Sequence, residues 1–184
     1  EVGSTFQATS GQAFAVDCTV CQPGTRVATP CSATSNTVCA DCEPGTFVEA
    51  ANVAECTNVV VGTTYQHESG KSFAHRCTEC TPGNRVRSAC TATSDAECEE
   101  CGEGMFSDVS GVAQCVAAEL GSTFQAASGQ AFAAACTECQ PGTRIATPCS
   151  ATSNTVCADC EPGTFVEAAN VAECTNVVVG TTYQ

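Results

Sequence analysis

The apolar residues of this chain gather in short runs between segments rich in glycine, proline and hydroxyl residues. The run 59–65 (VVVGTTY) is rich in β-branched residues and predicts a short strand, and 26–29 and 46–49 predict two more. Residues 48–55 could pass for a helix, but their counterpart in the middle of the chain contains Ser110 and Gly111, so we expect no helix there. The pattern predicts loops and short β-strands with little or no helix.

The pattern recurs every 59 residues. The 18 cysteines fall into three sets of equal spacing, and all ten aromatic residues occupy three positions of the repeat. We therefore expect three cysteine-rich repeats, at 1–59, 60–118 and 119–177, and the start of a fourth at 178–184. Segments 1–66 and 119–184 differ at only six positions, and the middle repeat differs more. We call the first and third repeats A-type and the second B-type.

The composition leaves little for an ordinary hydrophobic core. Leu, Ile, Val and Phe together number 30 of 184 residues, and Trp is absent. Such a chain cannot bury enough apolar surface to offset its conformational entropy, so cross-links must hold the fold. The net charge of −14 argues against nucleic acid or an anionic membrane surface as a partner. No stretch approaches the ~18 apolar residues of a membrane span.

The cysteines predict disulfides formed in an oxidising compartment, and hence a secreted, extracellular or cell-surface protein. A zinc alternative rests on the C-x-x-C pairs that begin at Cys18 and Cys39, but it leaves Cys31 and Cys56 without a role. We therefore expect no metal and no cofactor. Six cysteines per repeat still allow 15 pairings. Because the chain has no initiator Met and no signal peptide, we expect it to be a piece of a longer precursor.

Segment 18–47 carries a family resemblance. It contains a C-x-x-C followed by a glycine-containing turn, a middle Cys31, an Asn-Thr-x-Cys hook that ends at Cys39, and Cys-x-x-Gly-Thr-Phe at 42–47. It resembles the cysteine-rich modules of the tumour necrosis factor receptor type and is similar to ephrin-receptor-like cysteine-rich repeats. The resemblance covers about two-thirds of each repeat and recurs three times. The chain departs from the family in the 20 residues that separate Cys56 from Cys77, where the family has only a few.

The resemblance implies which cysteines pair. In that family the cysteines of a module pair one with two, three with five and four with six, which leaves no free thiol here. The implied bridges are Cys18–Cys31, Cys21–Cys39, Cys42–Cys56, Cys77–Cys90, Cys80–Cys98, Cys101–Cys115, Cys136–Cys149, Cys139–Cys157 and Cys160–Cys174. Such short loops should each stabilise the fold by about 3 kcal/mol. Because every bridge is local, we expect an elongated rod of small disulfide-rich repeats.

Hydroxyl residues offer candidate O-glycosylation sites. The chain has no N-x-Ser/Thr sequon, whereas Ser and Thr number 39. Clusters near proline and paired threonines suit O-linked sugars. The candidates are Thr29, Ser32, Thr34, Thr63, Thr64, Thr147, Ser150 and Thr152.

No residue pattern points to an enzyme. His67 and His75 occur only in the B-type repeat, and we expect them to be solvent-exposed polar residues. A nucleophilic cysteine would need a free thiol, which full pairing does not leave. The recurrent acids, which we expect to solvate the surface, include Glu49, Glu55, Glu167 and Glu173.

Two hypotheses for function remain open. The first is a structural subunit of an extracellular filament, flagellar hair or surface coat that associates with itself, because near-identical repeats present equivalent surfaces. The second, implied by the resemblance, is a ligand-binding ectodomain of a receptor or adhesion protein. The first predicts many more repeats in the full protein, and the second predicts a membrane anchor.

Overall fold

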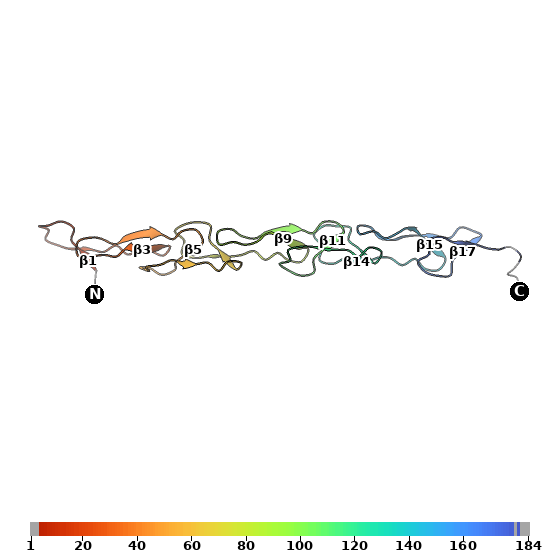
Figure 1. The fold of residues 1–184 in the computed structure, drawn as a ribbon, viewed down its shortest axis with the longest axis horizontal. Helices are drawn as coiled ribbons and strands as arrows, with labels where there is room; N and C mark the ends of the chain where they lie inside the picture. Colours follow the sequence, from red (N-terminus) through yellow and green to blue (C-terminus); the bar gives the residue numbers. More distant parts are fainter. Residues whose placement is uncertain (1–3, 179, 181–184) are drawn as a thin grey trace. The chain divides into compact units, whose positions relative to one another are not determined.

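The computed structural model describes residues 4–178 and 180 of the chain. Figure 1 shows short strands joined by loops, and the described residues contain no helix. In this part of the chain, no helix has the length and apolarity that a membrane crossing requires. The predicted class, a small disulfide-rich fold of loops and short strands, is confirmed.

The described strands pair into two-stranded sheets of three kinds. Insert hairpins are β1–β2 (Thr5–Phe6, Val16–Asp17), β7–β8 (Thr64–Tyr65, His75–Arg76) and β13–β14 (Thr123–Phe124, Ala134–Ala135). Long hairpins are β3–β4 (Thr25–Thr29, Val38–Asp41), β9–β10 (Asn84–Ser88, Glu97–Glu100) and β15–β16 (Thr143–Thr147, Val156–Asp159). Cystine-loop hairpins are β5–β6 (Thr46–Phe47, Thr57–Asn58), β11–β12 (Met105–Phe106, Val116–Ala117) and β17–β18 (Thr164–Phe165, Thr175–Asn176).

The long hairpin confirms the predicted strand at 26–29. In β3–β4, Arg26 lies opposite Ala40, and the register shifts between Val27 and Thr29, which marks a bulge. The predicted strand at 46–49 is shorter in the structure and ends at Phe47. It ends there because the carbonyl of Val48 accepts from another segment, the backbone N–H of Gly24, at 2.9 Å.

The prediction of one strand over 59–65 is wrong. The chain turns within this run, since the N–H of Thr63 and of Thr64 both donate to the carbonyl of Val60, at 2.9 and 2.8 Å. The hydroxyl of Thr64 accepts from the Val60 N–H at 3.0 Å and closes the same turn. Gly62 takes a φ of 83°, a conformation that a β-branched residue adopts only with strain. Glycine at this position therefore overrides the β propensity of its neighbours.

Residues 48–55 form no helix, as predicted. Asn52 adopts a left-handed φ of 57°, which asparagine tolerates better than most residues. Its N–H donates to the carbonyl of Cys21 at 2.9 Å, and its side-chain oxygen accepts from the Cys21 N–H at 2.8 Å. Gly111 occupies the equivalent position of the B-type repeat with a φ of 70°. The loop is thus folded onto the second cysteine of the repeat.

Cystines form the interior. The structure contains nine disulfides, the pairs that the family resemblance implies, and no free cysteine among the described residues. Most of the fully buried side chains are half-cystines, such as Cys42 and Cys101, whereas Phe14 is 85% exposed. Sulfur therefore takes the place that aliphatic side chains hold in an ordinary core.

The insert hairpin joins the chain to the preceding repeat through backbone hydrogen bonds. The N–H of Gly45 donates to the carbonyl of Gln66 at 2.7 Å, and the N–H of Gly70 donates to the carbonyl of Cys42 at 2.9 Å. Gly24 approaches the carbonyl of Gly70 so closely that a Cβ atom there would overlap it. The 20 residues between Cys56 and Cys77 thus carry an element that anchors the B-type repeat.

The chain divides into two compact units. One comprises Glu1–Thr78 with Ser88–Glu97, and the other comprises Glu79–Arg87 with Cys98–Gln184. These limits do not follow the 59-residue period, so the repeat boundaries 1–59, 60–118 and 119–177 stay a prediction. Of the predicted fourth start at 178–184, residues 179 and 181–184 lie outside the described part of the chain.

Candidate functional site

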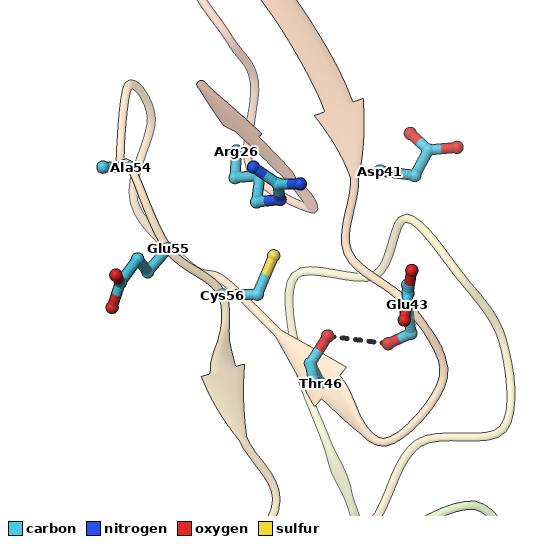
Figure 2. A pocket seen from close by; sticks show the side chains of 7 residues that line it. All are labelled: Arg26, Asp41, Glu43, Thr46, Ala54, Glu55 and Cys56. Atoms are coloured by element: carbon cyan, nitrogen blue, oxygen red, sulfur yellow. Dashed lines mark hydrogen bonds between the residues drawn. The ribbon is translucent and has the colours of Figure 1, made fainter. Parts of the chain in front are cut away.

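A hollow of about 370 Å³ lies between the long hairpin and the cystine-loop hairpin of the first repeat. Figure 2 shows the residues that line it, and we call it the A-pocket. Arg26 reaches it from β3, Glu43 from the turn that leads into β5, and Thr46 from the start of β5. The lining residues are Arg26, Asp41, Glu43, Thr46, Ala54, Glu55 and Cys56.

The disulfide Cys42–Cys56 determines the shape of the A-pocket. Its Cα atoms are 5.8 Å apart, so the neighbouring Glu43 and Glu55 are brought to one site although 12 positions separate them in sequence. The hydroxyl and the N–H of Thr46 both donate to the carbonyl of Glu43, at 2.7 and 3.0 Å. The turn that carries Glu43 is therefore held at both ends.

The A-pocket carries a negative balance of charge. Its lining includes three carboxylates, of Asp41, Glu43 and Glu55, and a single guanidinium, that of Arg26. Arg26 forms no ion pair within the described part of the chain, where the ion pairs are Lys71–Glu68 and Arg85–Glu99. The arrangement leaves carboxylate oxygens available to a cationic group from outside. Because the side chains are exposed, each such interaction would be weak by itself.

The same pocket recurs in the other repeats. In the third repeat it has a volume of about 310 Å³ and is lined by Arg144, Glu161, Thr164, Ala172, Glu173 and Cys174, each 118 residues after its counterpart. In the B-type repeat it has a volume of about 380 Å³ and is lined by Arg85, Glu100, Gly102, Met105, Gln114 and Cys115. This B-pocket has one lining carboxylate, and its arginine forms an ion pair with Glu99.

The predicted acids lie in two different places. Glu55 and Glu173 line the A-pockets. Glu49 and Glu167 are exposed and line neither of them.

The candidate O-glycosylation residues are mostly accessible. Ser150 and Thr64 are half-buried, and the hydroxyl of Ser150 already accepts two backbone N–H groups, from Thr152 and Ser153. Ser32 makes the equivalent bonds in the first repeat. The remaining candidates are exposed: Thr29, Ser32, Thr34, Thr63, Thr147 and Thr152.

The histidine prediction is right for one residue and wrong for the other. His67 is exposed, but His75 is half-buried and lies in a cluster of rings. A group of Cys77, Cys90 and Asp95 has metal-like spacing, but the two sulfur atoms form a disulfide and offer no thiolate.

Sequence reasoning missed a recurrent glutamine. Gln66 is fully buried, its side-chain N–H donates to the carbonyl of Phe73 at 2.7 Å, and its side-chain oxygen accepts from the N–H of Glu68 at 3.0 Å. Gln7 and Gln125 make the equivalent bonds in the A-type repeats. The signal was their shared position in the 59-residue period.

Comparisons with known proteins agree with this architecture. The profile of the TNFR/NGFR cysteine-rich region family matches residues 2–39, 61–98 and 120–157, which together make up more than half of the chain. Each matched segment begins ahead of an insert hairpin and ends in a long hairpin. The match therefore covers each repeat in the same register.

Curated relatives are similar over part of their length. Tumor necrosis factor receptor superfamily member 4 of Rattus norvegicus is 34% identical over 97 residues, which cover 49% of this chain and 35% of that protein. Superfamily member 14 of Homo sapiens is 28% identical over 126 residues, which cover 53% of this chain and 44% of that protein. The chain thus spans less than half the length of these relatives.

Among solved structures, a chain of a human RANKL/OPG complex is similar to this one at 19% identity and a TM-score of 0.27. The match covers 91% of this chain and 80% of the chain in that complex. A likeness at that score carries no argument about function. The threefold profile match, together with the shared spacing of the cysteines, shows that the chain belongs to the TNFR/NGFR cysteine-rich region family.

Proposed function

We propose that this chain is a segment of the ligand-binding ectodomain of a receptor or adhesion protein, and that its ligand is a protein. The observation that carries the proposal is the threefold match to the TNFR/NGFR cysteine-rich region. Cysteine-rich domains of this family are extracellular, and the curated relatives are named as receptors. A binding role needs no catalytic group, and we propose none.

The pockets are the places where side chains of a ligand would bind. Each A-pocket presents more carboxylates than cations, so it favours a lysine or arginine side chain of the partner. The B-pocket, where Met105 and Gln114 replace Thr46 and Glu55, favours a side chain without charge. The two pocket types therefore differ in the charge of the side chain that each one favours.

The proposal is tested by screening the untagged chain against folded extracellular protein domains. We expect saturable binding to at least one of them that weakens as salt is raised. Binding should weaken further in a pocket variant with Glu43→Gln, Glu55→Gln, Glu161→Gln and Glu173→Gln. Glu49→Gln with Glu167→Gln changes acidic residues of the same repeats outside the pockets and serves as the control. A chain that binds no domain, or loses affinity equally in both variants, would contradict the proposal.

A filament or coat subunit is the second candidate. It rests on the near-identity of residues 1–66 and 119–184, which repeats the A-pocket at an interval of 118 residues. The family match favours the receptor or adhesion role over this one. Sedimentation velocity separates the two, because a ligand-binding segment stays monomeric as its concentration rises, whereas a filament subunit forms growing assemblies.

O-linked glycosylation is part of the proposal. Thr29, Thr34, Thr147 and Thr152 are exposed beside the long hairpins, where a transferase can reach them. Intact mass of the natural protein before and after removal of O-glycans tests this, and a mass equal to that of the bare chain would contradict it.

A further inference from the structure

The insert hairpin of the B-type repeat places four rings on one face. Tyr65 lies opposite His75 in the register of β7 and β8. Side chains two positions apart on a strand point to the same side, and the rings of His67 and Phe73 join the pair. The ring centres of His67 and His75 are 5.8 Å apart, and Tyr65 stacks on both, at 6.0 and 5.3 Å. Phe73 meets His75 edge-on at 5.0 Å.

The loop between the histidines is held in place. Gln66, which directly precedes His67, is fully buried and bonded to the carbonyl of Phe73 at 2.7 Å. Gly70, at the far end of the loop, donates to the carbonyl of Cys42 at 2.9 Å. Both backbone segments that carry the imidazoles are therefore fixed before any ligand arrives.

The surroundings favour a cation. The carboxylate of Glu68 forms an ion pair with Lys71 at 2.9 Å, and that hydrogen bond and charge are the main reasons for its lowered pKa. The chain as a whole carries a net charge of −14.

We propose that His67 and His75 together bind one divalent transition-metal ion of the class that imidazole prefers, namely zinc, nickel or copper. Neutral imidazole is a common ligand for these ions and a poor one for calcium and magnesium. With Zn–N bonds of about 2.0 Å, two imidazoles on one tetrahedral ion have their ring centres about 5 Å apart. The observed 5.8 Å lies within reach of that value by rotation of the exposed His67 side chain.

The A-type repeats supply a built-in contrast. In the first repeat, Ala8 and Val16 stand where the B-type repeat has His67 and His75. The A-type insert hairpin forms the same strand pair without imidazoles, with Phe6 opposite Val16. The hairpin fold therefore does not need the histidines, and their presence in one repeat calls for another role.

The test is a calorimetric titration of the untagged full chain with Zn²⁺, and separately with Ni²⁺, at pH 7.5. We expect one ion per chain, with no competition from Ca²⁺. Binding should weaken as the pH is lowered, because a nitrogen ligand must be unprotonated to bind a metal ion. His67→Ala and His75→Val should each weaken binding by at least about tenfold, since either removes one of two ligands.

The double variant, His67→Ala with His75→Val, carries the A-type residues and is expected to keep the hairpin fold, checked by hydrogen exchange. Glu167→Gln, an exposed acid outside the pockets, is the control and should bind as the wild type does. Absence of stoichiometric binding in the wild type, or its persistence in the folded double variant, would overturn the proposal. This test is independent of the screen for protein ligands.

Discussion

The turn that ends at the fourth cysteine of each repeat is held by a different side chain in the two repeat types. In the A-type repeats the side chain is an amide, and in the B-type repeat it is a carboxylate. The N–H of Thr19 donates to the Asn36 side-chain oxygen at 2.7 Å, and the Asn36 amide donates to the Thr19 hydroxyl at 2.7 Å. In the B-type repeat the N–H and the hydroxyl of Thr78 both donate to Asp95, at 2.6 Å each. The turn is the same, but only the second version carries a charge.

The insert hairpins of the two repeat types also share a backbone but differ in the burial and identity of their side chains. Gln7 and Gln66 make the same hydrogen bonds, but Gln66 is fully buried and Gln7 is half-buried. The B-type hairpin adds two imidazoles to its aromatic face. Cystines and glycines thus give both repeat types one backbone, while the side chains at equivalent positions set charge, burial and ligand preference.

The largest expected effect tests the shared backbone. Cys80→Ala with Cys98→Ala, and Cys139→Ala with Cys157→Ala, each open a bridge with a sequence separation of 18. Each pair should lower the free energy of unfolding by about 3 kcal/mol, because loops of equal length restrict the unfolded chain equally. Denaturant unfolding followed by hydrogen exchange in each repeat measures this. A clear inequality between the two pairs would show that the backbones are not equivalent.

Glycine substitutions come next. Gly24 and Gly62 have similar positive φ values of 93° and 83°, but only Gly24 faces a close carbonyl, that of Gly70, whereas the space around Gly62 is open. Gly62→Ala should cost about 1–2 kcal/mol from its φ alone. Gly24→Ala should cost more, because its Cβ also displaces the insert hairpin. Denaturant unfolding measures both losses of stability. Equal losses would show that the close approach of Gly24 to the Gly70 carbonyl does not contribute to stability.

The recurrent glutamine predicts a smaller difference between the repeat types. Gln66→Ala leaves the Phe73 carbonyl and the Glu68 N–H without their partner, at a cost of about 2 kcal/mol. Gln7→Ala breaks equivalent bonds where water can replace them, and should cost about half as much. Hydrogen exchange of the two hairpins measures both. A larger loss of stability from Gln7→Ala than from Gln66→Ala would show that burial does not determine the cost of losing these hydrogen bonds.

The smallest effect concerns pH. The hydrogen bonds from the Thr78 hydroxyl and N–H hold the pKa of Asp95 below its usual value of 3.8. A lowered pKa stabilises the fold fully above the usual value, and this stability is lost as the pH falls through the lowered pKa. The B-type hook should therefore loosen in acid, and Asp95→Asn should remove that dependence. Hydrogen exchange at pH 2–5 tests this, with the Thr19 amide as the control, and acid loosening of both hooks would contradict it.

Several features were predictable because they depend on local chemistry. The strand at 26–29 and the absence of a helix over 48–55 follow from local residue preferences that tertiary contacts do not override. The strand over 59–65 was not predictable from β propensity, because Gly62 and the Thr64 hydroxyl form a turn that competes with it. Local preference is a weak guide where a single glycine can reverse the chain.

The candidate sites were harder to foresee. Arg26 and Glu55 line the same A-pocket because the Cys42–Cys56 bridge folds one segment against another. His67 and His75 meet because a hairpin register places them on one face. Spacing alone gave no reason to bring either pair together, since both depend on the path of the backbone between them.

Cysteine spacing, the 59-residue period and the shortage of aliphatic residues were enough to establish a cross-linked repeat fold, because disulfides between near neighbours act over short stretches of chain. The folded backbone was needed to show that Gln66 is buried, that the pockets alternate in charge, and that two imidazoles face each other. Such relations depend on distances between residues far apart in the chain, and a one-dimensional pattern does not contain those distances.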